Sequence, residues 1–138
     1  MKTYILDACA IVALFNDEIG ADVVDNLLVD ATTNGICSLT INKYNLLEVY
    51  YGYLREDGEV FAEQQLANIK ASCIRISDIL TDDLFRHAAK LKTNYKISLA
   101  DSIAVAQAVV DNAIIVTSDH HELDVVDQDG NVKFLWIR

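Results

Sequence analysis

Four carboxylates interrupt otherwise apolar stretches of this sequence. Asp7 and Asp119 each directly follow a short apolar run that predicts a buried β-strand. Glu48 lies within an apolar helical stretch, and Asp101 lies near the start of another. The carboxyl ends of parallel strands meet at one edge of a sheet, where open α/β sheets bind their ligands. We therefore expect the four side chains to share one crevice.

The carboxylates in such a crevice repel one another unless a cation lies between them. Two like charges about 4 Å apart, at an effective dielectric constant of about 20, repel by about 4 kcal/mol. Hard divalent cations prefer oxygen ligands and neutralise this charge. The acids therefore predict an enzyme that uses Mg²⁺ or Mn²⁺ to hydrolyse phosphodiester bonds.

Each acid also has a structural explanation. Asp7 is well placed to cap a helix, and Asp101 lies in a first helical turn, where the helix dipole favours an anion. Glu48 has no Lys or Arg three or four residues away. Its charge either reaches water at the edge of the apolar face or meets a partner elsewhere, and Asn45, one turn earlier, could orient it.

The polar segment after the fourth predicted strand contains several possible ligands. Asp119 either binds a metal or forms a turn, and Asp124 can supply one further oxygen. The adjacent His120 and His121 do not indicate zinc, because no second His or Cys pair lies at ligand spacing. Asp78 also ends a predicted strand, and either competes for the site or caps the following helix.

The remaining sequence predicts one domain, residues 1–138, of the α/β class, because apolar runs alternate with stretches of helical period. We expect strands at residues 3–6, 37–40, 73–76, 114–117 and 133–137, and helices at residues 9–16, after Gly20, and at 42–55, 60–70, 82–92 and 99–110. No helix is predicted between the strands at 114–117 and 133–137.

Composition limits the classes of function. The net charge of −10 has the wrong sign for a protein that holds nucleic acid by bulk electrostatics. No apolar run approaches the ~20 residues of a membrane-spanning helix. The three widely spaced cysteines, each in an apolar segment, favour reduced thiols and a cytoplasmic location.

In combination, the acidic motifs resemble those of PIN domains, and in particular of VapC-type toxins. The resemblance extends over nearly the whole chain and is carried by the ranges Tyr4–Phe15, Asn45–Gly52, Leu99–Ala108 and Ile115–Asp119. It implies a PIN-like three-layer α/β/α sandwich with a central parallel sheet. It also implies an endoribonuclease that uses Mg²⁺ or Mn²⁺, acts as the toxin of a toxin–antitoxin pair, forms a homodimer and binds a cognate antitoxin protein.

Carried over by motif, the metal-binding acids of this family are Asp7, Glu48, Asp101 and Asp119, with Asp124 as an outer acid. The sequence departs from the family at Ala8 and Cys9, where PIN domains usually carry Ser or Thr. That departure motivates the alternative of a catalytically weak PIN-like module that binds RNA or a protein partner.

Two other enzyme classes also place an acid after the first strand. A phosphatase similar to the haloacid dehalogenases needs a second Asp two residues after Asp7, where this sequence has Cys9. A receiver domain needs a Lys after a late strand, and none follows the run 114–117. Both classes are therefore disfavoured.

A basic strip offers a contact for the RNA backbone. Arg86, Lys90, Lys92 and Lys96 lie in a segment without acids, and Arg86 and Lys90 share a helix face. We expect Arg86 and Lys90 to contact substrate phosphates; the alternative is an ordinary solvated helix face.

Overall fold

The computed structural model describes residues 1–138 and confirms the predicted alternation of strands and helices. The strands are β1 Lys2–Leu6, β2 Cys37–Asn42, β3 Arg75–Ser77, β4 Ile114–Thr117 and β5 Lys133–Trp136. The helices are α1 Ala8–Phe15, α2 Ala21–Val29, α3 Lys43–Asp57, α4 Glu59–Ala71, α5 Asp82–Asn94, α6 Leu99–Asp111 and α7 His120–Gln128, and a π-helical segment, η1 Asp30–Asn34, continues α2.

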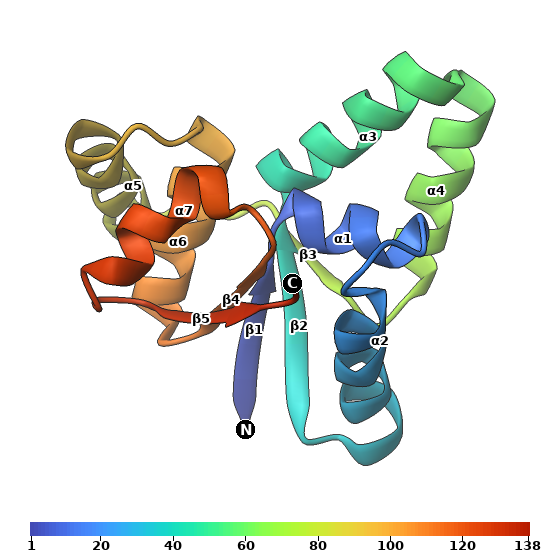
Figure 1. Cartoon of the computed structure of the whole chain (residues 1–138), viewed down its shortest axis with the longest axis horizontal. Coiled ribbons are helices and arrows are strands. Elements are labelled where there is room, and N and C mark those ends of the chain that lie inside the picture. Colours follow the sequence, from blue (N-terminus) through green and yellow to red (C-terminus); the bar gives the residue numbers. More distant parts are fainter.

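The five strands form one parallel sheet in the order β3-β2-β1-β4-β5. The chain proceeds from β1 outward to β3 and then returns to the other side of β1 with β4 (Figure 1). The strand order therefore reverses between β1 and β4. In an open α/β sheet, this switch point at the carboxyl ends of the strands is where a ligand binds.

Helices cover both faces of the sheet, which confirms the three-layer α/β/α sandwich. On one face, Leu6, Leu39 and Val116 pack against α1 to α4 in the largest apolar cluster. On the other face, Ile5 and Ile115 pack against α6 and α7. Helix α5 lies outside α6 (Figure 1), and the two helices share a third, smaller apolar cluster.

The structure corrects two local predictions. Helix α7 forms where the sequence predicts no helix, because Asp119 caps it and Leu123 and Val126 on its inner face are buried. Asp78 does not cap α5: Thr81 does, and its Oγ1 accepts a hydrogen bond from the Leu84 amide at 3.2 Å.

No helix in the structure has the length and apolar character needed to cross a membrane. The three cysteines form no disulfide.

Candidate active site

A cavity of about 180 Å³ lies at the carboxyl ends of β1 and β4, at the switch point. Its lining residues are Asp7, Ala8, Cys9, Glu48, Ser98, Asp101, Asp119 and Glu122. Five of these eight carry a carboxyl group, and none is Lys, Arg or His. The structure thus brings four of the acids singled out in the sequence together and adds a fifth.

Asp7 is fixed by the elements on either side of it. Its Oδ1 accepts a hydrogen bond from the Ala10 amide at 2.9 Å, which caps α1. Its Oδ2 accepts one from the Thr117 hydroxyl, and this hydroxyl accepts one from the Asp119 amide at 2.9 Å. Only 1% of Asp7 is exposed. Asp7 therefore caps a helix and lines the acidic cavity, and Thr117 couples its position to that of Asp119.

Three helices begin at this cavity. Asp7 caps α1, Ser98 caps α6 with Asp101 in its first turn, and Asp119 caps α7. The amino-terminal end of a helix carries a partial positive charge. The converging ends therefore offset part of the repulsion among the carboxylates before any cation binds.

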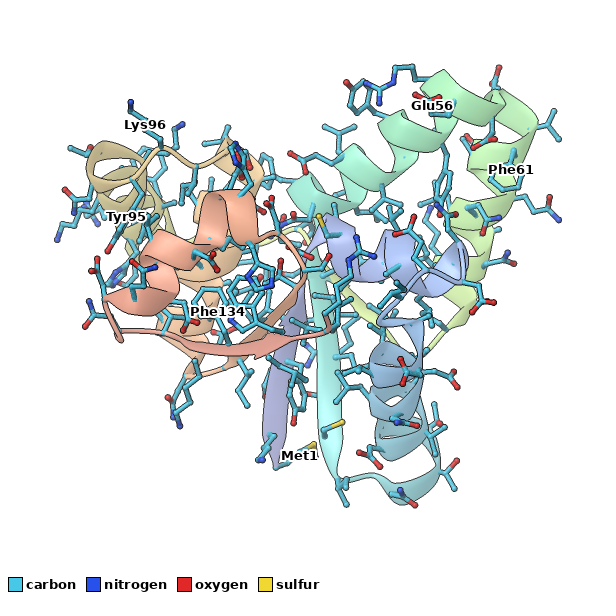
Figure 2. All side chains as sticks on the ribbon, viewed as in Figure 1. Met1, Glu56, Phe61, Tyr95, Lys96 and Phe134 are labelled. Carbon is cyan, nitrogen blue, oxygen red and sulfur yellow. The ribbon has the colours of Figure 1, made fainter.

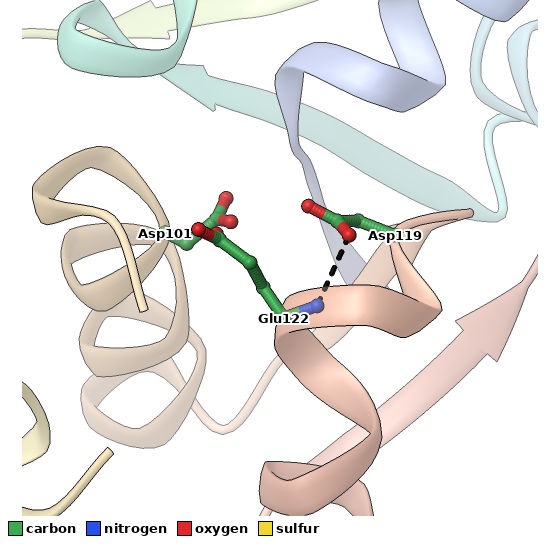
Figure 3. Close-up of side chains that lie close together, drawn as sticks. All are labelled: Asp101, Asp119 and Glu122. Atoms are coloured by element: carbon green, nitrogen blue, oxygen red, sulfur yellow. Dashed lines mark hydrogen bonds between the residues drawn. The ribbon is translucent and has the colours of Figure 1, made fainter. Parts of the chain in front are cut away.

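Glu122 is the acid that the sequence analysis missed. One oxygen from each of Asp101, Asp119 and Glu122 lies within 4.8 Å of the other two (Figure 3). Glu122 also accepts a hydrogen bond from the Ser98 amide at 3.3 Å, and its own amide donates to Asp119 at 3.1 Å. The signal was present as an acid three residues after a helix cap, a pattern typical of helix starts. The sequence pattern alone does not identify Glu122, because no helix is predicted after Asp119.

Glu48 reaches the cavity from α3 and is exposed. Asn45 forms no hydrogen bond with it, contrary to the suggestion that Asn45 orients Glu48. Instead, Asn45 Oδ1 accepts from the Ala8 amide at 3.3 Å, and its Nδ2 donates to the Ala100 carbonyl at 3.1 Å. Asn45 is fully buried. It therefore ties the residue after Asp7 to the residue before Asp101.

The acidic surroundings change the protonation of the cluster. Burial raises the pKa of Asp7 to about 7. The hydrogen bond from Thr117 lowers this pKa, but the effect of burial is larger. Burial also raises the pKa of Asp101, and the contact with the Glu122 carboxylate, to which a protonated Asp101 can donate, raises it further. Burial and the charges of Glu122 and Asp119 raise the pKa of Glu48. The cluster therefore holds protons at neutral pH unless a cation replaces them.

The donor set fits a hard divalent cation. All the charged groups of the lining are carboxylates, and carboxylate oxygens are the ligands that Mg²⁺, Mn²⁺ and Ca²⁺ take. Asp101, Asp119 and Glu122 are the residues that can share one ion, and Asp7 lies in the same cavity.

We expect Asn45→Ala to weaken binding of Mn²⁺ to this cluster. The substitution leaves the Ala8 amide without its partner, which costs about 1–3 kcal/mol, and removes the side-chain hydrogen bond to the Ala100 carbonyl, so the two acid-bearing segments are no longer tied together. The rise in melting temperature caused by Mn²⁺ should therefore be smaller in the variant.

Leu27→Ala in α2 is the control for lost stability alone, because this buried core residue lies outside the acidic cavity. It should lower the melting temperature but retain the full Mn²⁺-induced rise. An equal rise in Asn45→Ala and the wild type would show that Asn45 only stabilises the fold.

Cys9 stands in the cavity where the family usually has a hydroxyl. Burial and the surrounding acids, Asp7 first, raise the pKa of its thiol to about 12. The neutral thiol is a weaker hydrogen-bond donor than a hydroxyl. The departure noted in the sequence therefore lies in the lining of the acidic cavity.

Other predicted site residues lie elsewhere. Asp124 is not in the lining of the cavity; its Oδ1 contacts His120 Nδ1 at 2.7 Å. Arg86 and Lys90 are exposed on α5. Lys96 projects from the connection between α5 and α6 (Figure 2).

Residues 4–128 match the family model of the PIN domain. Because this match spans most of the 138 residues, the chain belongs to the PIN domain family. No curated protein matches its sequence.

Solved structures share its fold. It is similar to a chain of VapBC2 from Rickettsia felis bound to a DNA fragment from their promoter, with a TM-score of 0.72, 18% identity, and coverage of 96% of this chain and 97% of that chain. A chain of DNA-bound VapBC from Salmonella typhimurium gives a TM-score of 0.69 and 18% identity over 100% of both chains. VapC20 from Mycobacterium tuberculosis, a sarcin-ricin loop cleaving toxin, gives a TM-score of 0.65 and 16% identity, with coverage of 85% of this chain and 90% of that chain. At these identities the similarity establishes the fold alone.

Proposed function

We propose that this protein is a metal-dependent endoribonuclease and the toxin of a toxin–antitoxin pair. The observation that carries the proposal is the cavity at the switch point of a PIN domain, where separate elements place five carboxylates together. Such a cluster would hold the divalent cation that stabilises negative charge on the reacting phosphate.

Each acid has a distinct part in the proposed reaction. A bound Mg²⁺ or Mn²⁺ ion would supply Lewis-acid stabilisation of charge on the phosphate and a lowered pKa for the attacking water. Asp101, Asp119 and Glu122 would hold the ion, and the buried Asp7 would complete its charge balance. Glu48 is exposed and has a raised pKa, which suits it to orient the water and accept its proton.

The partners follow from the solved relatives. VapBC2 and VapBC, which share this fold, were solved bound to DNA, and VapC20 is a toxin that cleaves the sarcin-ricin loop. We accordingly propose RNA as the substrate, a cognate antitoxin as a binding partner and a homodimer as the assembly. Arg86 and Lys90 on α5 are proposed to contact RNA phosphates, since a chain of net charge −10 needs a local group of bases to neutralise phosphate charge.

Incubation of the purified protein with a mixture of structured and single-stranded RNA tests the activity. We expect cleavage with Mn²⁺ and none with excess EDTA. Glu122→Gln should lower the rate by at least about tenfold, because it removes one of the three carboxylates that would hold the ion and each 1.36 kcal/mol lost is a factor of about ten. Glu59→Gln, which changes an exposed acid on α4 outside the cavity, should cleave at the wild-type rate.

The second candidate function is a PIN-like module that binds RNA or a protein partner but cleaves poorly. Cys9 in the cavity favours it, because a thiol replaces the usual hydroxyl. Cys9→Ser separates the two functions. Cleavage that appears only in this variant would support the binding module, whereas cleavage by the wild type supports the nuclease.

A further inference from the structure

The face of the sheet toward α5 and α6 changes character from one half to the other. Over β1 and β4 it is apolar, and Ile5 and Ile115 pack beneath α6. Over β2 and β3 it carries Ser38, Thr40 and Ser77 instead, because side chains alternate along a strand and the apolar residues of β2 face α1 to α4. Strands in a parallel sheet are normally apolar on both faces. The residues of this half of the face therefore do not form an apolar core with the helices above them.

A cleft of about 400 Å³ lies over these polar residues. It is lined by Thr3, Ser38, Thr40, Arg75, Ser77, Ile79, Thr81, Leu84, Gln107, Val110 and Asp111, none of which lines the acidic cavity. The strand register places Thr3 beside Ser38 and Thr40 beside Arg75, which creates a continuous polar floor. Its volume lies in the range of about 300–1,000 Å³ typical of small-molecule sites.

One buried group of the cleft lacks the partner that its chemistry requires. Gln107 is 6% exposed, and its Oε1 has no hydrogen-bond partner in the chain. A buried amide oxygen of this kind is unusual in a folded protein and calls for a specific explanation. Arg75 takes part in none of the four ion pairs of the chain. The cleft thus offers a buried, unpaired acceptor at Gln107 and an exposed cation at Arg75 that forms no ion pair within the chain.

We propose that this cleft binds a small sugar phosphate, either free or as the ribose phosphate of a mononucleotide. The hydroxyl groups of the floor, the Gln107 amide and the Asp111 carboxylate match the donors and acceptors of a sugar. The guanidinium of Arg75 matches a phosphate. Leu84 and Val110 provide apolar surface for the face of the ring. The proposal does not depend on the nuclease function, because the two sites share no residue.

Calorimetric titration of the intact protein with ribose 5-phosphate and with AMP tests the proposal. Excess EDTA is present throughout, so that phosphate cannot bind through a cation at the acidic cavity. We expect both ligands to bind at millimolar or lower concentration. Equal affinities would identify the free sugar phosphate as sufficient, and tighter binding of AMP would identify the nucleotide.

Substitutions of two cleft residues test whether the ligand binds in the cleft. Arg75→Ala should weaken it at least about tenfold, because a hydrogen bond to a charged group is lost, whereas Arg55→Ala, at an exposed arginine on α3, should leave it unchanged. Gln107→Leu should also weaken binding, yet its melting temperature should equal or exceed that of the wild type, because an unpaired buried acceptor is removed.

Three results would overturn the proposal. The first is no binding of either ligand, which would leave the polar floor as a surface that contacts only water. The second is inorganic phosphate binding as tightly as ribose 5-phosphate, which would reduce the cleft to an anion site. The third is binding that Arg75→Ala does not change, which would place the ligand elsewhere.

Discussion

Asp7→Asn should lower the rate of RNA cleavage by at least about two orders of magnitude. Lewis-acid stabilisation of the reacting phosphate is worth several kcal/mol, and each 1.36 kcal/mol is a factor of about ten in rate. Asp7 is the most deeply buried acid of the cavity, so an amide in its place removes a charge that solvent cannot restore. The measurement is single-turnover cleavage of a defined RNA at saturating Mn²⁺.

Asp78→Asn is the matched control. Asp78 directly follows β3, as Asp7 follows β1, but it is exposed and lies outside the cavity. It should therefore cleave like the wild type. Equal cleavage by Asp7→Asn and the wild type would show that the acidic cavity does not carry the activity.

The second large effect concerns metal and pH. The metal-free protein should lose stability as the pH rises from about 4 to about 7. The folded-state pKa of Asp7, about 7, lies above its ordinary value of 3.8. The folded state thus retains a proton that the unfolded chain releases, so raising the pH favours unfolding. For Asp7 alone the loss approaches about 4 kcal/mol, and the raised pKa of Asp101 acts in the same direction.

A divalent cation should reverse this loss. The ion binds the deprotonated carboxylates, so the stabilisation it provides grows with pH over the same range. At a Mn²⁺ concentration of about 100 Kd, the gain is about 2.7 kcal/mol, or about 5–10 °C in melting temperature.

Melting curves at pH 5 and pH 8, with Mn²⁺ and with EDTA, measure both effects. Asp7→Asn serves as the comparison, because removal of one of the titrating groups should reduce the pH dependence of the metal-free protein while that of Asp101 remains. A metal-free melting temperature that rises from pH 5 to pH 8 would contradict the linkage. A Mn²⁺-induced rise in melting temperature of the same size at pH 5 and pH 8 would also contradict it.

The sequence by itself determined most elements and the identity of most of the acids. Asp7 and Asp119 could be placed at one sheet edge because a parallel sheet gathers the ends of its strands. The same reasoning placed Asp78 at that edge, but it could not decide between strands. Strand order decided: β1 and β4 are neighbours at the switch point, whereas β3 is the far edge of the sheet.

Only the tertiary structure decided which polar residues meet. Glu122 joins Asp101 and Asp119 because α7 turns it toward α6, while Asp124 on the same helix meets His120 instead. Asn45 bonds to Ala8 and Ala100, which lie 37 and 55 residues from it in the chain. Local patterns specify helices and strands because period and capping act over a few residues. Contacts between distant elements depend on how helices pack across the sheet, and no short stretch of the sequence encodes that packing.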